Sequence, residues 1–381
     1  MKCPIIEEDL GGLIFEATLY RYSQKEVYKK KAIQLTNQLL TVFSDRNVLS
    51  GFFEGFEGIF YTIQYLYHCK IIEDDSLLDD LEEYLLKSLS IDFKINNFDP
   101  LHGSIGKLLY YINSKNKDKE KVNQLVNTFI DSLYNNKKET DHGIFWYDDN
   151  EDVKDLVNLG VAHGLAGILS FLLRLKELGY NNTYLDILIT GIIKTILNSK
   201  NNIPRISNFP DYYSKNINQT NINSRLAWCY GDLGIAYTLL YASKVLQRDD
   251  LKVEVENITN STIRRTISNS GINYYEDYSF FDTGFCHGIS GIVFILQKIN
   301  NTLNQPNIDK RIQFWKKELF YNLEKQLKIK EDIYLPWYRQ DDKYSYTLDK
   351  ESMLNGLCGT GLVLLSLEYK QYDWSDFFML F

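Results

Sequence analysis

The chain has 381 residues, of which 44% are hydrophobic, so a sizeable core is possible and global disorder is excluded. The net charge is −8 and Lys and Arg are not clustered, which argues against nucleic acid as the main ligand. No apolar run approaches the ~18 residues of a membrane span, and acidic residues follow the first few positions where a signal peptide would be hydrophobic. We therefore expect a cytoplasmic protein that is not integral to a membrane.

Two kinds of predicted helix alternate along the chain. Amphipathic helices are predicted at 25–43, 77–89, 122–134, 184–198, 253–267 and 312–327. Between them, Gly-x-x-Gly pairs each open a uniformly apolar helix, and their first glycines are Gly55, Gly103, Gly164, Gly231, Gly288 and Gly356. Repeated pairs of one buried and one half-buried helix favour a closed, double-layered, all-α ring over residues 1–381.

The residue before each first glycine is polar although an apolar helix follows. This column reads Glu54, His102, His163, Tyr230, His287 and Asn355. In a ring of parallel inner helices these side chains would face one another at one end. The helix N-termini gather at that end too, and their positive field favours thiolates and other anions.

Two cysteines occupy equivalent positions in consecutive repeats. Cys229 and Cys286 each lie two residues before a first glycine, and His287 follows Cys286 directly. Neighbouring helices lie ~8–10 Å apart, so two such thiols can converge on one ion. Cys, Cys and His without an obvious fourth ligand is typical of catalytic zinc, whereas structural zinc sites have four ligands. The alternative is that both cysteines are small buried hydrophobic residues.

The other cysteines are expected to be structural or peripheral. Cys358 lies inside the start of its helix, out of register with the pair, and is interpreted as core with a minor alternative as a fourth ligand. Cys69 lies late in an inner helix, and Cys3 in a tail. An odd, sparse set of this kind does not form a disulfide framework.

An open zinc position beside His163 suggests either of two chemistries. Zinc can activate water for hydrolysis, or it can hold a substrate thiol as thiolate. Two Cys ligands make zinc a poorer Lewis acid for water but leave a bound thiolate nucleophilic, which favours thiol chemistry. Alcohol oxidation at such a site would need a dinucleotide fold, and no Gly-x-Gly-x-x-Gly follows a predicted strand.

These motifs resemble the lanthionine synthetase C family, the lanthipeptide cyclases. The resemblance covers essentially the whole chain and is sharpest at four motifs, namely Ser224 to Gly231, Cys286-His287-Gly288, Ala162 to Gly167, and Asp99 to Gly103. It implies an α/α toroid, usually described with seven helical pairs, although only six glycine signatures are visible here. It also implies a chain that lacks a dehydratase part and acts on a peptide dehydrated by a separate enzyme.

The resemblance further implies which residues act. Cys229, Cys286 and His287 would bind zinc, and the reaction would add a Cys thiolate of a precursor peptide, which carries a leader, to dehydroalanine or dehydrobutyrine. His163 would take the thiol proton or protonate the enolate, and Asp99 would orient or charge-balance a histidine. Arg225 and Tyr230 match further active-site positions, whose roles are less defined, and His102 is not required by the family. A complex with the dehydratase and an exporter is implied as common in the family.

Alternatives stay open at this point. His163 could be a hydrogen-bonded structural residue, Asp99 a turn or cap residue before Pro100, and Arg225 a partner of a surface carboxylate. The protein could be a non-cyclising adaptor that binds glutathione or a peptide, or could add a small thiol to dehydrated peptides. An (α/α) barrel glycosidase is disfavoured, because it would need paired carboxylates at the barrel mouth. The segment 201–224 is a lid, a docking loop or an insertion.

Overall fold

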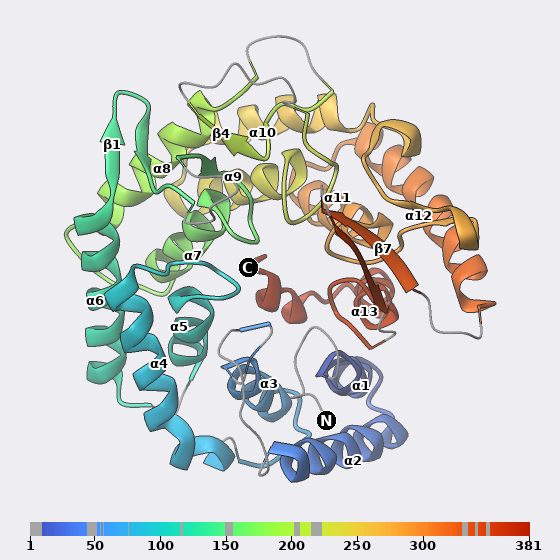
Figure 1. The fold of residues 1–381 in the computed structure, drawn as a ribbon, viewed down its shortest axis with the longest axis horizontal. Helices are drawn as coiled ribbons and strands as arrows, with labels where there is room; N and C mark the ends of the chain where they lie inside the picture. Colours follow the sequence, from blue (N-terminus) through green and yellow to red (C-terminus); the bar gives the residue numbers. More distant parts are fainter. Residues whose placement is uncertain are drawn as a thin grey trace.

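The computed structural model describes residues 10–43, 52–53, 55, 57–74, 76–114, 117–148, 155–201, 206–214, 223–329, 334–339, 342–347 and 351–381. Within these residues the α-helices form two concentric layers around a common centre (Figure 1). The inner layer contains α1 (Leu10–Ser23), α3 (Glu57–His68), α5 (Ser104–Asn113), α7 (Leu165–Glu177), α9 (Asp232–Leu246), α11 (Ile289–Leu303) and α13 (Leu357–Tyr369). The outer layer contains α2 (Glu26–Phe43), α4 (Glu82–Ile95), α6 (Lys119–Asn136), α8 (Leu185–Asn198), α10 (Asp249–Thr262) and α12 (Pro306–Leu327).

The inner helices close into a ring. Each packs against the next in the order α1, α3, α5, α7, α9, α11 and α13, and α13 packs back against α1. The predicted α/α toroid is therefore confirmed. None of the described helices is long and apolar enough to cross a membrane.

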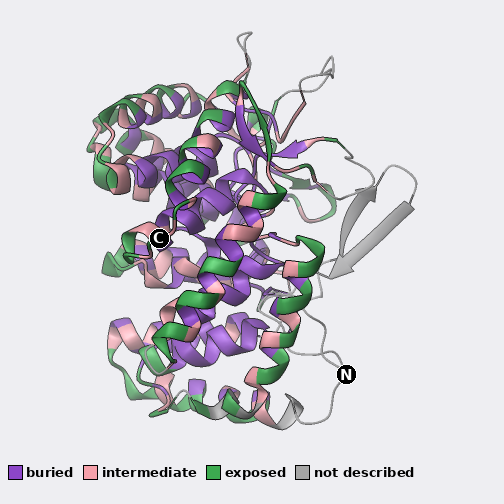
Figure 2. Cartoon of the chain, turned by 90° about the vertical axis from the view of Figure 1, so that its left-hand side faces the viewer, coloured by how far each residue is buried: buried purple, intermediate pink, exposed green. Residues whose placement is uncertain are grey.

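Apolar patterning explains the two layers. Helix α9 is buried continuously from Asp232 to Ala242, whereas α12 buries Ile308, Ile312, Trp315 and Leu319 along one stripe. Spacings of three and four residues place such a stripe on one face of a helix. Seen from the side, buried residues fill the interior and exposed ones follow the outer helices (Figure 2).

Short antiparallel strand pairs lie in the loops between the helices. They are β1 (Lys138–Thr140) with β2 (Gly143–Phe145), β3 (Val157–Asn158) with β4 (Tyr212–Tyr213), β5 (Tyr274–Tyr275) with β6 (Phe280–Phe281), and β7 (Tyr334–Arg339) with β8 (Asp342–Thr347). Short 3₁₀ helices lie at Ser76–Leu81, Ile267–Asn269, Glu276–Tyr278 and Asp373–Phe378. The pair β3–β4 joins the start of the third repeat to the described part of the 201–224 segment, 206–214.

The glycine pairs open the inner helices as predicted, and packing explains the second glycine of each pair. The first glycine is the N-cap in five repeats, as at Gly164 and Gly231. A Cβ added at the second glycine, Gly234, would lie 2.7 Å from Val161 Cγ2 of the preceding repeat. The nearest atom to that Cβ would be Trp228 O at 2.4 Å, so the missing side chain leaves room for the entry loops of its own repeat and of the preceding one.

A recurring backbone hydrogen bond sets the register between repeats. In three repeats, the N–H groups of the two residues just before the column residue donate to one carbonyl of the next repeat. Thus Val161 N donates to Cys229 O at 3.0 Å, Trp228 N to Cys286 O at 3.2 Å, and Phe285 N to Leu354 O at 2.8 Å. Equivalent residues of successive repeats are therefore held at equal height around the ring.

The structure answers one question that the sequence left open, whether the ring has six or seven sectors, and it adds one feature that was not predicted. The ring has a seventh sector, α1 with α2, whose inner helix carries adjacent glycines, Gly11 and Gly12, in place of a Gly-x-x-Gly pair. The centre of the ring is filled by the last residues of the chain, where the Phe378 carbonyl accepts a hydrogen bond from Trp228 Nε1 at 3.0 Å. Only six Gly-x-x-Gly pairs are visible in the sequence, and no role was predicted for the C-terminal segment.

Candidate active site and metal centre

The three predicted metal ligands converge at the N-terminal end of the inner helices. One ligand atom from each of Cys229, Cys286 and His287 lies within 4.8 Å of the other two. The shared carbonyl of Cys286, which accepts from Trp228 N and Cys229 N, explains why two residues so far apart in sequence meet. The donor set, two soft thiol sulfurs and one imidazole, is compatible with zinc.

The imidazole of His287 is supported by a carboxylate that sequence reasoning missed. His287 Nε2 lies 3.5 Å from Oδ2 of Asp282, whose side chain is only 3% exposed. Tyr275 OH donates to Asp282 Oδ2 at 2.9 Å and Gly284 N donates to Oδ1 at 2.7 Å, so the carboxylate is fixed. A carboxylate on one ring nitrogen leaves the other available to a metal, the usual support of metal-binding histidines.

The thiols of Cys229 and Cys286 differ in how readily they lose a proton. The hydrogen bond from Cys286 lowers the pKa of Cys229 well below its usual value, and His287 and Arg225 act in the same direction against burial. The same contact with Cys229, together with burial, raises the pKa of Cys286. A thiolate already favoured in this pocket is the state that a zinc ligand requires.

Arg225 lies beside this group, in the loop that leads into α9. Its positive charge favours the thiolate forms of both cysteines. It also acts on Asp211, whose burial raises its pKa to about 6 while Arg225 opposes that rise. The structure therefore places Arg225 close to the thiol pair, as the resemblance implies, and also near one carboxylate.

Asp99 and His163 come from different repeats and form a dyad. His163 Nδ1 lies 2.8 Å from Asp99 Oδ2. The other carboxylate oxygen of Asp99 accepts from the backbone N–H groups of Leu101 at 2.7 Å and His102 at 2.8 Å. Asp99 is thus both a turn-stabilising residue and a partner of His163, so the two readings of its role are compatible.

Within the dyad, Asp99 and His163 each stabilise the charged form of the other. Burial opposes protonation of His163, but the hydrogen bond and charge of Asp99 outweigh it and raise the pKa of the imidazole. Burial would likewise raise the pKa of Asp99, but His163 lowers it. The ring of His102 stacks on that of His163, with centroids 5.1 Å apart. The imidazole is held between a carboxylate and a second ring.

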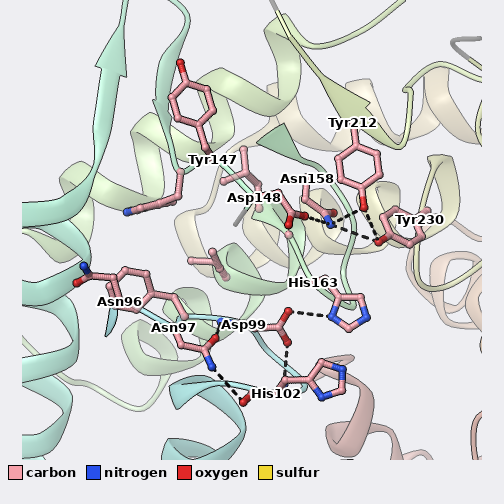
Figure 3. A pocket seen from close by; sticks show the side chains of 15 residues that line it. Asn96, Asn97, Asp99, His102, Tyr147, Asp148, Asn158, His163, Tyr212 and Tyr230 are labelled. Carbon is pink, nitrogen blue, oxygen red and sulfur yellow. Dashed lines mark hydrogen bonds and ion pairs between the residues drawn. The ribbon is translucent and has the colours of Figure 1, made fainter. Parts of the chain in front are cut away.

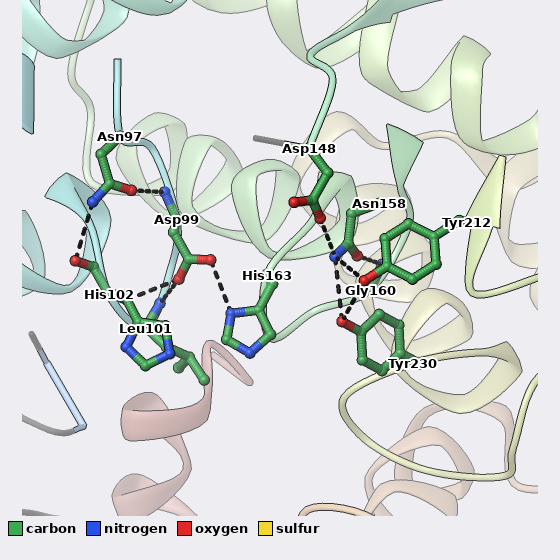
Figure 4. Close-up of polar contacts among 10 residues, drawn as sticks. All are labelled: Asn97, Asp99, Leu101, His102, Asp148, Asn158, Gly160, His163, Tyr212 and Tyr230. Carbon is green, nitrogen blue, oxygen red and sulfur yellow. Dashed lines mark hydrogen bonds and ion pairs between the residues drawn. The ribbon is translucent and has the colours of Figure 1, made fainter. Parts of the chain in front are cut away.

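Across from the dyad, Tyr230 belongs to a polar network centred on Asn158 (Figure 4). Asn158 Nδ2 lies 3.3 Å from Tyr230 OH and 3.1 Å from Asp148 Oδ2, and Tyr212 OH lies 3.3 Å from Tyr230 OH. Asn158 Oδ1 accepts from Gly160 N at 3.0 Å. Burial raises the pKa of Tyr230, so its phenol stays protonated at neutral pH.

A cavity of about 370 Å³ lies between the dyad and this network (Figure 3). Its wall includes Asp99 and His163 on one side and Asp148, Tyr212 and Tyr230 on the other. Trp146 and Tyr147, which directly follow β2, line the same cavity. Part of the 201–224 segment therefore borders the site through Tyr212.

Comparison with known proteins identifies the family. The chain matches the description "Lanthionine synthetase C-like protein" over residues 9–380. It belongs to the lanthionine synthetase C-like family. The nisin biosynthesis protein NisC of Lactococcus lactis subsp. lactis is 25% identical over 331 residues, which cover 78% of this chain and 74% of that protein. The solved structure of nisin cyclase superposes with a TM-score of 0.75 at 23% identity, covering all of this chain and 92% of the other.

The remaining residues singled out from the sequence are either placed by the structure or lie outside its described residues. Cys358 is half-buried and not the core residue that was predicted, and it is not part of the ligand group, whereas Cys69 is buried at the end of α3, as expected. Glu54 and Cys3 lie outside the described residues. Asp282, Asn158 and Asp148 were not singled out from the sequence. A carboxylate shortly ahead of Cys286-His287 was the one visible signal for Asp282.

Proposed function

We propose that the protein is a zinc-dependent lanthipeptide cyclase. The observation that carries this proposal is the convergence of Cys229, Cys286 and His287 in a ring that also presents an Asp99-bound His163. Membership of the family and the similarity to a nisin cyclase support it. The substrate would be a precursor peptide that carries cysteines and dehydrated Ser or Thr residues.

Zinc held by Cys229, Cys286 and His287 would supply a site where a peptide thiol binds as thiolate at neutral pH. The charge of Arg225 and the helix N-termini favour anionic sulfur in the same region. Asp282 orients His287 so that one ring nitrogen remains available as a ligand. These residues thus favour a sulfur nucleophile at the open zinc position.

The reaction is a balanced addition. The thiol loses its proton, a C–S bond forms at the β-carbon of dehydroalanine or dehydrobutyrine, and the π-electron pair moves toward the α-carbon and its carbonyl. Protonation at the α-carbon completes the thioether. One proton leaves sulfur and one arrives at carbon, so the enzyme needs a group that carries a proton between the two positions.

His163 is suited to carry that proton. Asp99 accepts from Nδ1, which fixes the ring and leaves Nε2 as the exchanging nitrogen. The raised pKa of His163 gives the imidazole a larger protonated fraction near neutral pH than an unperturbed histidine has, which favours proton donation to the α-carbon. Tyr230, with its phenol protonated, is available as a hydrogen-bond donor toward developing negative charge.

The partners follow from the chemistry of the substrate. The electrophile arises by dehydration of Ser or Thr, so a dehydratase must act on the peptide first. We propose that the protein receives its peptide from such an enzyme in the cytoplasm, and that an exporter removes the product. Co-purification of the three proteins from cells that carry tagged cyclase would test this arrangement.

The metal assignment is tested by zinc content. Wild-type protein should contain about one zinc per chain, Cys286→Ala should lose most of it, and Cys358→Ala should retain it. The Cys358 variant is the matched control, since it removes a thiol at the same end of the ring. Equal zinc in the wild type and Cys286→Ala would overturn the assignment.

The reaction is tested by counting thiols. A dehydrated peptide incubated with the enzyme should lose alkylatable thiols without a change in mass, because addition is an isomerisation. A thiol count equal to that of the uncatalysed control would favour an adaptor that binds peptides or glutathione without cyclising them.

A further inference from the structure

Asn158 takes no part in the addition chemistry described above, yet its side chain is the centre of the polar network beside the cavity (Figure 4). The residue belongs to β3, is only 5% exposed, and pairs with Tyr212 of β4. Its backbone oxygen and its Oδ1 both lie against Gly164, where an added Cβ would be 2.4 Å from each of them. The strand pair and this close packing together fix where the amide lies.

Hydrogen bonding fixes which end of the amide carries the nitrogen. Oδ1 accepts from the Gly160 N–H at 3.0 Å, and the flipped amide would put two donors against each other there. Nδ2 carries two hydrogens and lies 3.1 Å from the carboxylate oxygen Oδ2 of Asp148. It also lies 3.3 Å from Tyr230 OH and 3.5 Å from Tyr212 OH. One amide hydrogen thus serves the carboxylate, and the other is directed at the phenol oxygens.

This orientation determines what the phenol of Tyr230 can do. A phenol oxygen that accepts from an amide keeps its own hydrogen for another acceptor. Tyr230 and His163 line the same cavity, so that hydrogen can be donated to a peptide bound between them or to Tyr212 OH at 3.3 Å. A carboxylate in place of the amide would accept the phenol hydrogen and withdraw it from the peptide.

We propose that Asn158 is a positioning residue, whose amide keeps the phenol of Tyr230 as a hydrogen-bond donor toward the negative charge that develops on the peptide during addition. This inference rests on the proposed function for the reaction that it serves. Asp282 is used in the same way, since its Oδ1 accepts from the Gly284 N–H and its Oδ2 lies 3.5 Å from His287 Nε2. In both turns one side-chain atom anchors to the backbone and the other orients a residue of the site.

The test compares Asn158→Asp with Tyr230→Phe in thioether formation on a dehydrated peptide. Tyr230→Phe should lower kcat roughly 100-fold, because it removes one donor toward developing charge. Asn158→Asp should approach the same loss while KM stays within about twofold of the wild type, since the affected hydrogen bond stabilises the transition state. In the Tyr230→Phe background, Asn158→Asp should reduce kcat no further. Losses that multiply in the double variant would overturn the proposal.

Two controls separate this role from a structural one. Asn182 has the same contacts away from the cavity lining, with Oδ1 2.9 Å from Tyr184 N and Nδ2 3.2 Å from Asp131 Oδ1, so Asn182→Asp should keep kcat within twofold. The exchange of Asp148→Asn with Asn158→Asp keeps an amide and a carboxylate in contact, and it should recover stability in urea that Asn158→Asp loses by placing two carboxylates together. It should not recover kcat, because no amide hydrogen then faces Tyr230. Recovery of kcat by the exchange would contradict the positioning role.

An NMR measurement separates this inference from the proposed function. Protein labelled at its Asn side-chain nitrogens shows the two amide hydrogens of Asn158, which are assigned by their absence in Asn158→Asp. One of them should shift upfield in Tyr230→Phe, which lacks the accepting oxygen, whereas those of Asn182 should not move. Unchanged Asn158 resonances would refute the contact whether or not the protein cyclises peptides.

The two measurements together give distinct outcomes. Cyclisation by the wild type with multiplying losses in the double variant refutes the positioning role and leaves the cyclase intact. The expected shift of the Asn158 resonance without cyclisation of any dehydrated peptide supports the contact of Asn158 with Tyr230 and refutes the cyclase.

Discussion

Replacing Asp99 with Asn should disable the proton carrier while leaving its surroundings folded. The amide can still accept from the N–H groups of Leu101 and His102, which bond to Asp99 Oδ1 at 2.7 and 2.8 Å. What disappears is the charge at 2.8 Å from His163 Nδ1. An amide that donates to Nδ1 would also stabilise the opposite tautomer and place the proton on Nε2.

The size of the effect follows from that hydrogen bond. A hydrogen bond to a charged group contributes about 1.5–3 kcal/mol. If this stabilises the imidazolium formed during proton transfer, its loss lowers kcat/KM by roughly 10- to 150-fold. Asp99 raises the pKa of His163, so the variant should have a lower pKa at His163, and the pH limb that reports this group should move to lower pH.

The assay measures kcat/KM for thioether formation across pH, together with NMR titration of the histidine ring protons. The chain has only five histidines, so His163 can be assigned by comparison with a His163→Asn variant. Asp141→Asn serves as the control, because it removes one exposed carboxylate in the turn between β1 and β2. An unchanged pH profile and an activity within twofold of the wild type would refute the role assigned to the dyad.

Three further outcomes are expected. Asp282→Asn should weaken zinc binding by roughly 10- to 100-fold in chelator competition, with both cysteines intact, because His287 loses its support. Lys107→Met should lower the free energy of unfolding in urea by about 3–5 kcal/mol, because it removes the cation that pairs with the buried carboxylates of Glu57 and Asp92. Adding Glu57→Gln and Asp92→Asn to this variant should recover part of the lost free energy. Gly167→Ala should cost about 1–3 kcal/mol in the same assay, because its Cβ would lie 2.1 Å from Val161 O and 2.6 Å from Pro100 Cγ.

The sequence predicted the two layers and the convergence of Cys229, Cys286 and His287 because both depend on a repeating register. Glycine at helical spacing marks where inner helices meet, and the column before it marks one end of the ring. The sector α1–α2 was not predicted because its glycines, Gly11 and Gly12, are adjacent and not three residues apart. A Cβ at Gly11 would clash with the backbone of Glu351 and Met353. The same packing need is met there with a different sequence pattern.

The supporting residues could not be predicted because they come from loops whose paths the repeat does not determine. Asn158 lies opposite Tyr212 because β3 pairs with β4, and that pairing joins segments separated by more than 50 positions. Asp282 reaches His287 through a tight turn whose geometry is held by Tyr275 and Gly284. Local side-chain geometry of this kind leaves no periodic trace in a sequence.

The position of the dyad, in contrast, has a cause that is visible in the sequence. In other repeats, the N–H groups of the two residues just before the column residue donate to a carbonyl of the next sector. The N–H groups of Trp228 and Cys229, for example, donate to Cys286 O. In the second repeat one of these positions is Pro100, which has no N–H, and the N–H of Leu101 donates to Asp99 in place of the neighbouring sector. The Asp-Pro dipeptide thus interrupts the backbone ladder and directs the other Asp99 oxygen at His163. The cavity borders on this interruption, so the turn that made Asp99 resemble a structural residue is what positions it for proton transfer.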